Sequence, residues 1–397
     1  MGEDRARTRR IRQHVTAREH RFFAVVQPGF ERIAQDELAS LGARDAEAVE
    51  GGVEFSGRLE DCYRMNLCAR TIVRVLMRLT GFRAERFERV REKVAAFPWE
   101  LYLAPGEPLA VRASARKSRL HHTGRLEEEV RGGIAERMGE GVMPDAARGD
   151  EGAQTVFLRF ERDRCQVSLD ASGALLHKRG YRHDAGEAPL RETTAAAIVL
   201  AARADAYDGI IDPMCGSGTL AVEAALIATG LPPGAARGFA FEAWPAFRPA
   251  AYRHMKGKIL EPLMPPALPR GRSILAFDAS DAAVVAARAN RDAAGLTGCI
   301  DITRGDFFSL PRPFEGKTLV AINPPYGKRS MAGASVKSLY RRIGAVLRER
   351  YADAGYAIIV PGLECEKALG LPYDRKILFM NGGIRVAALI RDAHYVT

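Results

Sequence analysis

Short apolar runs alternate with segments of helical spacing along the second half of the chain. The runs occupy 209–212, 273–278, 299–303, 319–323, 356–360, 376–380 and 384–390, and the amphipathic segments occupy 217–229, 281–294, 335–351 and 363–369. This alternation predicts an α/β fold with a doubly wound, Rossmann-like sheet of seven strands. Asn381-Gly382-Gly383 separates the last two runs and predicts a tight hairpin, because Asn-Gly suits a type I′ turn with φ > 0 at both central positions. We therefore expect the last strand to run antiparallel to the others.

The first half of the chain carries a different mixture of strands and helices. Strand-like runs lie at 21–26, 51–57, 71–82, 108–115 and 155–171, the last long enough for a hairpin, and helical stripes lie at 30–41, 59–69, 87–97 and 125–138. This mixture predicts an α+β region with split β-α-β character. We accordingly divide the chain into a flexible basic arm (1–20), an α+β region (21–170), a linker rich in glycine and charge (171–190) and the parallel α/β domain (191–397).

Composition excludes several classes of protein. With 47% hydrophobic and 27% charged residues, a chain of 397 residues can bury the cores of two or three domains and is not disordered throughout. No apolar run approaches the roughly 18 residues of a membrane-spanning helix, and the N-terminus lacks the apolar stretch of a secretory signal. We therefore expect a cytoplasmic protein with no membrane partner. The net charge of +10 favours polyanionic partners, although a general bias toward arginine explains it equally well.

The cysteines form no pattern that predicts a metal site. They are Cys62, Cys68, Cys165, Cys215, Cys299 and Cys365. No two of them form a C-x-x-C pair, and none lies at zinc-ligand spacing from a histidine. We therefore expect reduced thiols and no bound metal.

A glycine-containing turn connects the first strand of the parallel domain to the helix after it. The turn comprises Asp212, Pro213, Met214, Cys215, Gly216, Ser217, Gly218 and Thr219. Its two glycines permit a tight turn and the close approach of a ligand to the backbone. Asp212, at the carboxyl end of its strand, can accept hydrogen bonds from the ammonium group of a ligand. The turn lacks the third glycine of a dinucleotide fingerprint, and an ordinary strand–helix turn is the alternative interpretation.

Two more acidic residues follow the next two strands. Asp278 ends the second strand, where an acidic side chain can bind ribose hydroxyls. It lies much further from Gly218 than the usual spacing of about 20 residues, so 230–270 must contain an insertion. The alternative role for Asp278 is to cap the helix at 281–294. Asp306 follows the third strand and can accept from an adenine amino group while Phe307 packs on the ring, although this pair alone is weak evidence.

Asn323-Pro324-Pro325-Tyr326 follows the fourth strand. The two prolines impose a rigid, extended turn. A planar amine with two N–H donors needs two acceptors, which the Asn323 side-chain oxygen and the Pro324 carbonyl can supply. Tyr326 offers an aromatic face on which a base can stack, so we expect Tyr326→Phe to retain most activity. The alternative is a proline-rich strand end with a tyrosine in the core.

In combination, these motifs resemble a known family. Asp212 to Thr219 with Asn323 to Gly327 resembles the amino-methylating class I S-adenosylmethionine-dependent methyltransferases, whose seven-stranded sheet also ends in a reversed strand. The segments 176–182, 188–202, 237–247 and 322–329 extend the likeness to the RlmL/YpsC-type 23S rRNA (guanine-N2)-methyltransferases. The segment 113–130 is similar to the THUMP RNA-binding domain of those proteins, which implies a ferredoxin-like and THUMP architecture for 21–170. The resemblance covers about residues 20–395.

The resemblance implies S-adenosyl-L-methionine as the cofactor. Its contacts would be Asp212 to Thr219, Asp278 at the ribose, Asp306 with Phe307 at the adenine, and Arg191, Glu192 and Thr193, which correspond to a segment that closes over the cofactor in the family. For the target amine the resemblance implies Asn323, Pro324 and Tyr326. It also implies that this amine is N2 of a guanine in RNA.

A basic cluster in the THUMP-like segment suits contacts to RNA phosphates. Its members are Arg112, Arg116, Lys117, Arg119 and Arg125. A solvated loop and helix start is the alternative. 23S rRNA is the first choice of substrate, and a tRNA guanine, a DNA adenine or a protein glutamine would suit the same amine motif. A non-catalytic RNA-binding or ribosome-assembly protein is the alternative of another class.

Overall fold

The computed structural model describes residues 2–139, 143–146, 150, 152–182, 190–326 and 333–393. The chain divides into two compact units, one formed by 1–25, 37–176 and 238–257, and the other by 26–36, 177–237 and 258–397. Each unit contains a seven-stranded sheet. Among the described residues, no helix combines the length and apolar character needed to cross a membrane.

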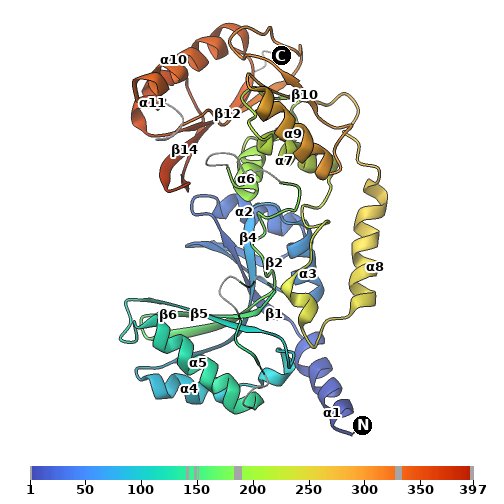
Figure 1. The fold of residues 1–397 in the computed structure, drawn as a ribbon, viewed down its shortest axis with the longest axis vertical. Coiled ribbons are helices and arrows are strands. Elements are labelled where there is room, and N and C mark those ends of the chain that lie inside the picture. Colours follow the sequence, from blue (N-terminus) through green and yellow to red (C-terminus); the bar gives the residue numbers. More distant parts are fainter. Residues whose placement is uncertain are drawn as a thin grey trace. The chain divides into compact units, whose positions relative to one another are not determined.

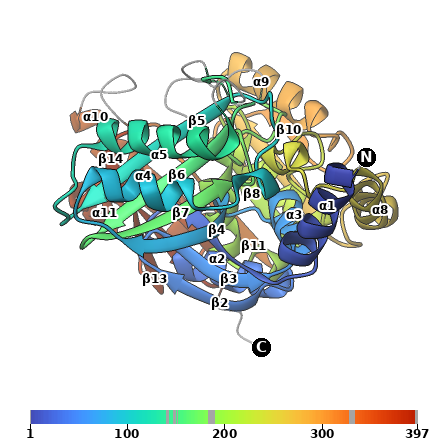
Figure 2. The same cartoon turned by 90° about the horizontal axis from the view of Figure 1, so that it is seen from below.

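The first unit is built on a mixed sheet. Its strands are β1 (His20–Val26), β2 (Arg44–Val49), β3 (Gly52–Gly57), β4 (Ile72–Arg83), β5 (Leu109–Arg116), β6 (Gln154–Glu161) and β7 (Arg164–Asp170). They lie in the order β2-β3-β1-β4-β7-β6-β5, with β5 and β6 parallel and the pairs β1/β3, β4/β7 and β6/β7 antiparallel. Helices α4 (Phe87–Ala95) and α5 (Thr123–Met138) run side by side along β5 and β6 (Figures 1 and 2). The α+β character predicted from the sequence is confirmed.

The edge strand β2 was not predicted. It contains Arg44, Asp45 and Glu47, and all its positions are exposed or partly buried, so no apolar alternation marks it. Its register against β3 shifts between Arg44 and Glu47, and Asp45 adopts a φ of 51°. An edge strand tolerates such polar residues because one of its sides is unpaired.

Residues 2–16, expected within a flexible arm, are helical in the structure. Helix α1 (Gly2–Ile11) continues into a π-helical turn at Arg12–Thr16. The Arg7 guanidinium donates hydrogen bonds of 3.1 and 3.0 Å to the Glu100 carbonyl oxygen, and Val15 is buried. A few specific contacts of this kind produce no periodic apolar stripe, so the sequence pattern did not indicate the helix.

The second unit contains the predicted parallel sheet. Its strands are β8 (Gly209–Asp212), β9 (Ser273–Asp278), β10 (Asp301–Arg304), β11 (Thr318–Ile322), β12 (Gly355–Val360), β13 (Arg375–Asn381) and β14 (Ile384–Arg391). They lie in the order β10-β9-β8-β11-β12-β14-β13, and β14 is antiparallel to both of its neighbours. All seven predicted strands and the reversed last strand are confirmed.

Helices connect these strands. They are α7 (Thr219–Thr229), α9 (Asp281–Ala293), α10 (Gly333–Arg350) and α11 (Leu363–Leu369), and α6 (Glu192–Ala201) precedes β8. Elsewhere in the chain, α8 (Pro249–Leu260) lies in the insertion between β8 and β9, α2 (Glu31–Ser40) follows β1, and α3 (Leu59–Cys68) follows β3 in the first unit. Helix α6 was not among the predicted helices. Nine of its ten residues are buried, and a helix that is buried on all sides carries no polar stripe to reveal its period.

The hairpin between β13 and β14 has the predicted two-residue turn but a different alignment. Asn381 pairs with Ile384 as the last residue of β13, so Gly382 and Gly383 occupy the two central positions. Their φ angles are 54° and 81°, a region that glycine enters at little cost. The glycines therefore satisfy the conformational demand of the turn, and Asn381 does not have to.

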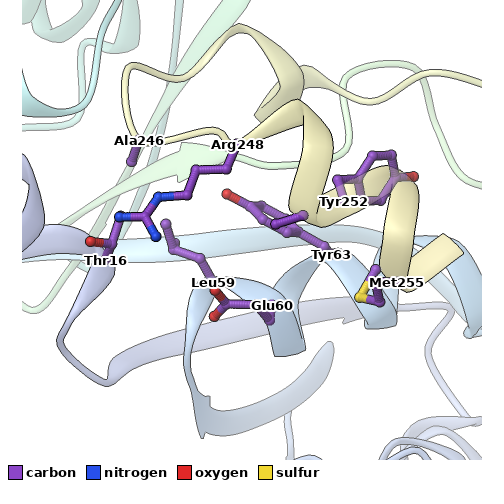
Figure 3. A pocket seen from close by; sticks show the side chains of 9 residues that line it. Thr16, Leu59, Glu60, Tyr63, Ala246, Arg248, Tyr252 and Met255 are labelled. Atoms are coloured by element: carbon purple, nitrogen blue, oxygen red, sulfur yellow. The ribbon is translucent and has the colours of Figure 1, made fainter.

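The insertion between β8 and β9 supplies residues 238–257 to the first unit. There Tyr63 of α3 stacks on Phe241 with ring centroids 4.3 Å apart. Phe247 and Tyr252 make edge-to-face contacts with Tyr63, at centroid distances of 5.8 and 6.0 Å. A cavity of about 20 Å³, room for one water, lies beside these rings (Figure 3). Aromatic packing thus explains why so apolar a segment interrupts the parallel domain.

Candidate functional site

The register of the second sheet aligns three acidic residues along one edge. Asp212, the last residue of β8, pairs with Ala276 of β9, and Asp278 lies two residues beyond Ala276. Asp278 in turn pairs with Arg304, the last residue of β10. Asp306 follows two residues later. The strands are parallel, so all three carboxylates stand at their carboxyl ends.

Asn323 joins this edge from the other side of β8. Val320 of β11 pairs in parallel with Ile211, and Asn323 comes directly after the end of β11. The order β10-β9-β8-β11 therefore places the four predicted motifs on four adjacent strands. The crevice outside the carboxyl ends of such strands is where open α/β sheets bind ligands.

The glycine turn is held against the end of β9 by backbone groups. The Cys215 N–H donates to the Phe277 carbonyl at 3.1 Å, and the Gly216 N–H donates to Asp278 Oδ2 at 3.0 Å. Gly216 has a φ of 53°, and a Cβ built on it would meet no atom within 4 Å. The outer side of the turn is therefore open, as the approach of a ligand requires.

Helix α9 supports the same turn. Asn290, which is almost fully buried, donates from Nδ2 to the Ser217 carbonyl at 2.9 Å. Gly218 has a φ of 80°, and a Cβ on it would lie 3.1 Å from the Cβ of Ala287. Gly218 is thus required both by its backbone conformation and by the close approach of α9.

Asp212 lies in a buried, strongly desolvated position. It is 1% exposed, and neither carboxylate oxygen forms a hydrogen bond within the described part of the chain. Desolvation raises the pKa of Asp212 to about 8, and the nearby Asp278 carboxylate adds to the rise. The backbone amides of Ala221 and Met214 oppose it without reaching hydrogen-bond geometry. A cationic ligand would stabilise the ionised form of this buried carboxyl, so the position suits the binding of such a ligand.

Asp278 links the turn to helix α9. Besides the Gly216 amide, it accepts the Ser280 N–H at 2.9 Å through Oδ1. Ser280 is the N-cap of α9, and its hydroxyl accepts the Ala283 N–H at 3.4 Å. Capping is therefore done by Ser280 and not by Asp278. Each carboxylate oxygen of Asp278 retains a lone pair for a further donor.

Asp306 makes its hydrogen bond within its own loop, and Phe307 packs in the core. Asp306 is exposed, and its Oδ1 accepts the Phe308 N–H at 3.0 Å. Phe307 is 2% exposed and packs in the core, with its ring centroid 6.0 Å from that of Tyr351. The described contacts of Phe307 are those of a core residue, and its stacking on a ligand ring stays a prediction.

The amine motif also retains an unused acceptor. Asn323 is half-buried, and its Oδ1 has no hydrogen-bond partner among the described residues. Pro324 is buried, and the hydroxyl of Tyr326 accepts the Asn381 Nδ2–H at 2.8 Å. Burial raises the pKa of Tyr326, and this hydrogen bond opposes the rise. Gly327 and Lys328 lie outside the described residues.

Arg191, Glu192 and Thr193 begin helix α6. Arg191 is its exposed N-cap, whereas Glu192 and Thr193 are 3% and 1% exposed. Glu192 Oε2 and Thr193 Oγ1 have no hydrogen-bond partner in the described chain. Desolvation raises the pKa of Glu192, and the charge of Arg182 opposes the rise.

Arg182 connects three segments around the glycine turn. Its guanidinium donates to the Thr219 hydroxyl at the start of α7 and to the Leu190 carbonyl at 3.0 Å. Its Nε lies 3.4 Å from Glu192 Oε1. This contact network joins the first residues of α6 and α7, next to the turn.

A match to a protein-family model decides the relationship of this chain to known proteins. Residues 179–387, more than half of the chain, match the UPF0020 model, described as the RMKL-like methyltransferase domain. Residues 21–76 match the RlmL ferredoxin-like domain.

The chain belongs to the RMKL-like methyltransferase family.

Relatives extend the likeness over most of the chain. The ribosomal RNA large subunit methyltransferase K/L of Syntrophotalea carbinolica is 33% identical over 390 residues, which are 94% of this chain and 53% of that protein. A candidate RNA methyltransferase of Synechocystis sp. PCC 6803 is 29% identical over 369 residues, 91% of this chain and 94% of that protein. The crystal structure of SMU.472, a candidate methyltransferase complexed with SAH, superposes with a TM-score of 0.84 at 26% identity and covers 96% of this chain and 99% of that one.

This chain spans about half the length of the K/L methyltransferases that it matches. Its RMKL-like domain includes the glycine turn and the Asn323 motif, and the ferredoxin-like match includes β1 to β3. The family and the predicted fold class are thereby confirmed. The roles of individual site residues stay predictions.

Outside the methyltransferase domain, the structure places the predicted basic cluster on one exposed stretch of the first unit. Arg112 and Arg116 belong to β5, Lys117 and Arg119 to the loop after it, and Arg125 to α5. Three of these side chains pair with carboxylates, namely Arg116 with Glu50, Arg119 with Glu85 and Arg125 with Glu88. Exposed pairs of this kind are weak and can be exchanged for a phosphate contact.

The described residues show no group of three or more His, Cys, Asp or Glu side chains suited to a metal ion. All six thiols are free, and five are buried.

Sequence reasoning missed several residues of the candidate site. Arg182, Asn290 and Asn381 all contact predicted site residues, but each lies many positions from its partner in the chain. The 176–182 segment already carried a family likeness, and that was the one signal for Arg182. Nothing local marks Asn290, and Asn381 was assigned to the turn.

Proposed function

We propose that this chain is an S-adenosylmethionine-dependent methyltransferase that modifies the exocyclic N2 amine of a guanine in RNA, with 23S rRNA as the substrate. The observation that carries the proposal is a pair of unused acceptors at adjacent strand ends. Among the described residues, both carboxylate oxygens of Asp212 and the Oδ1 of Asn323 lack hydrogen-bond partners. The glycine turn follows β8 at the same end of the sheet, against the end of β9. One acceptor suits an ammonium group and the other an amine.

The residues present fit S-adenosylmethionine. Asp212 would neutralise its ammonium group, since a buried carboxylate needs a cation or several donors to remain ionised. Asp278 has free lone pairs for ribose hydroxyls, and Gly216 leaves the backbone accessible. The SAH in the SMU.472 structure is the product form of this cofactor, which supports the assignment. When bound, the cofactor supplies an electrophilic methyl group.

The target amine would lie at Asn323. A guanine N2 lone pair is delocalised into the ring, so the free amine is a poor nucleophile. Hydrogen bonds from its two N–H groups to Asn323 Oδ1 and the Pro324 carbonyl would favour a pyramidal nitrogen and direct the lone pair toward the methyl group. Such positioning can lower the barrier by several kcal/mol. The proton can leave after methyl transfer, so no general base is required.

RNA is the substrate best supported by the whole chain. The matched relatives include proteins named as ribosomal RNA large subunit methyltransferases, and the first unit presents an exposed basic cluster. A base in RNA must leave its stack to enter such a site, and Tyr326 offers a ring face to receive it.

The test is mass spectrometry of nucleosides from RNA treated with the full chain and deuterated-methyl S-adenosylmethionine. Undermodified 23S rRNA should yield labelled N2-methylguanosine, and in the same reaction time the Asp212→Ala and Asn323→Ala variants should yield far less of it. Label found only in tRNA would show that tRNA, and not 23S rRNA, is the substrate. Label in N6-methyladenosine, or in no nucleoside, would contradict the proposal.

A further inference from the structure

The β13–β14 hairpin contains an asparagine whose side chain is not required by the turn. Asn-Gly at a hairpin usually indicates that Asn adopts a positive φ. Here Gly382 and Gly383 adopt the positive φ angles, and Asn381 is an ordinary strand residue paired with Ile384. Its side chain is 7% exposed, so its amide must find partners inside the protein.

The partner of Asn381 belongs to the amine motif. Asn381 Nδ2 donates to the Tyr326 hydroxyl at 2.8 Å, a normal hydrogen-bond length, although 55 residues separate them. The neighbouring Tyr340 hydroxyl donates to the Ile359 carbonyl at 2.7 Å, so it has a partner of its own. The end of the edge strand β13 and the segment after β11 are thus joined through these two side chains.

This bond changes how the Tyr326 ring is held. Pro324 and Pro325 restrict the backbone before the tyrosine, but they leave its side-chain torsions free. A hydrogen bond to the hydroxyl at the far end of the ring limits rotation about χ1. Because a phenol oxygen accepts hydrogen bonds near the plane of its ring, the same bond favours one orientation of the ring face that is expected to receive the target base.

We propose that Asn381 is a positioning residue for the target base, acting by orienting Tyr326 through its hydroxyl. The proposal rests on the proposed function, because it takes Tyr326 as the stacking surface for that base. It reverses the expectation from the sequence that the tyrosine hydroxyl is dispensable.

The test compares Asn381→Leu, Tyr326→Phe and the double variant, with Met380→Ala as a matched control at an exposed position of the same hairpin. Each single change removes the hydrogen bond that orients the Tyr326 ring, so kcat should fall about five- to tenfold. Cofactor and RNA dissociation constants should stay within twofold. The double variant leaves neither group unpaired and should be no slower than the slower single variant. Met380→Ala should match the wild type.

A second measurement does not depend on activity. In protein labelled at tyrosine Cζ, the Tyr326 resonance, assigned by its loss in Tyr326→Phe, should shift in Asn381→Leu and stay in place in Met380→Ala. An unshifted resonance would overturn the proposal even if methyl transfer is never observed. Wild-type kcat in Asn381→Leu, or multiplicative losses in the double variant, would overturn it while leaving the proposed function intact. Tyr326→Phe leaves the hairpin unaltered and tests the same bond if Asn381→Leu does not fold.

Discussion

At the scale of single residues, Asp212 has the least favourable environment in the site. A carboxyl that is 1% exposed and has no hydrogen-bond partner in the described part of the chain prefers its neutral form, and its pKa of about 8 reflects that preference. The unfolded chain would ionise this group near pH 4, so the ligand-free protein loses stability from Asp212 as the pH rises from about 4 to 8. A cationic ligand would remove this penalty, which is how a binding residue can be unfavourable until its ligand arrives.

Cofactor affinity should consequently depend on pH. If the ammonium group of S-adenosylmethionine binds ionised Asp212, the site must release a proton below about pH 8, and the affinity should fall about tenfold per pH unit there. Calorimetry at pH 6, 7 and 8, in two buffers of different ionisation enthalpy, measures both the affinity and the released proton. Asp212→Asn should bind weakly with no proton release. Equal wild-type affinity at all three pH values would contradict the role of Asp212.

Asn323→Ala should abolish methyl transfer and spare binding. Among the described residues its Oδ1 has no partner, so the change leaves none of their polar groups unsatisfied and should not unfold the chain. Loss of a preorganised polar contact of about 3–4 kcal/mol corresponds to a hundredfold or greater loss in rate. Single-turnover kinetics would measure it, with cofactor and RNA dissociation constants as controls. Methylation within a few-fold of wild type would refute the amine cradle and favour transfer to a ring carbon or a hydroxyl.

At the scale of elements, a buried ion pair joins the segment before α6 to helix α7. Arg179 and Glu223 are 4% and 0% exposed, their closest atoms are 3.4 Å apart, and the Tyr181 hydroxyl donates to Glu223 at 3.1 Å. Together with Arg182, they attach the segment that precedes α6 to the helix that begins at the glycine turn. The turn therefore depends on an electrostatic network behind it as well as on β9 and α9.

Arg179→Met should destabilise the chain by about 3–5 kcal/mol, because it leaves the Glu223 carboxylate buried without its cation. Urea unfolding followed by circular dichroism would measure the change. The double variant Arg179→Met with Glu223→Leu should recover much of the loss, because no buried charge remains. If the free energy of unfolding of the double variant fell further below that of Arg179→Met, the two losses would be independent and the side chains would not be coupled.

At the scale of the whole molecule, RNA affinity should depend mainly on the exposed basic cluster of the first unit. Phosphate contacts position RNA without reading its sequence, so the affinity should vary little among RNAs. Replacing Arg116 and Arg119 by Ala should weaken binding and reduce the slope of log K against log salt by about one per lost contact. Arg44→Ala is the matched control, since Arg44 is an exposed arginine of the same unit with a similar ion pair to Glu19.

Fluorescence anisotropy of labelled RNA across a salt series would measure these slopes. An unchanged slope in the double variant would place the phosphate contacts elsewhere on the chain. Loss of equal size in Arg44→Ala would show a diffuse effect of net charge instead of a site.

The sequence by itself determined the parallel sheet, its reversed last strand and the positions of the four strand-end motifs. These features depend on periodicity over a few residues and on the backbone preferences of glycine and proline, which act locally. It did not mark β2, whose edge position tolerates polar residues, or α6, whose burial on all sides removes any stripe. The missing signal reflects an edge position in the first case and packing on all sides of the helix in the second.

Only the tertiary structure decided which groups meet. Strand register put Asp212 beside Asp278 and Asn323, and burial raised the pKa of Asp212 to about 8. In the β13–β14 hairpin, two glycines form the turn, and the Asn381 side chain donates a hydrogen bond to Tyr326. Aromatic packing around Tyr63 explains why residues 238–257 belong to the first unit. Desolvation and hydrogen bonding between distant segments depend on the assembled fold, so no local pattern could predict them.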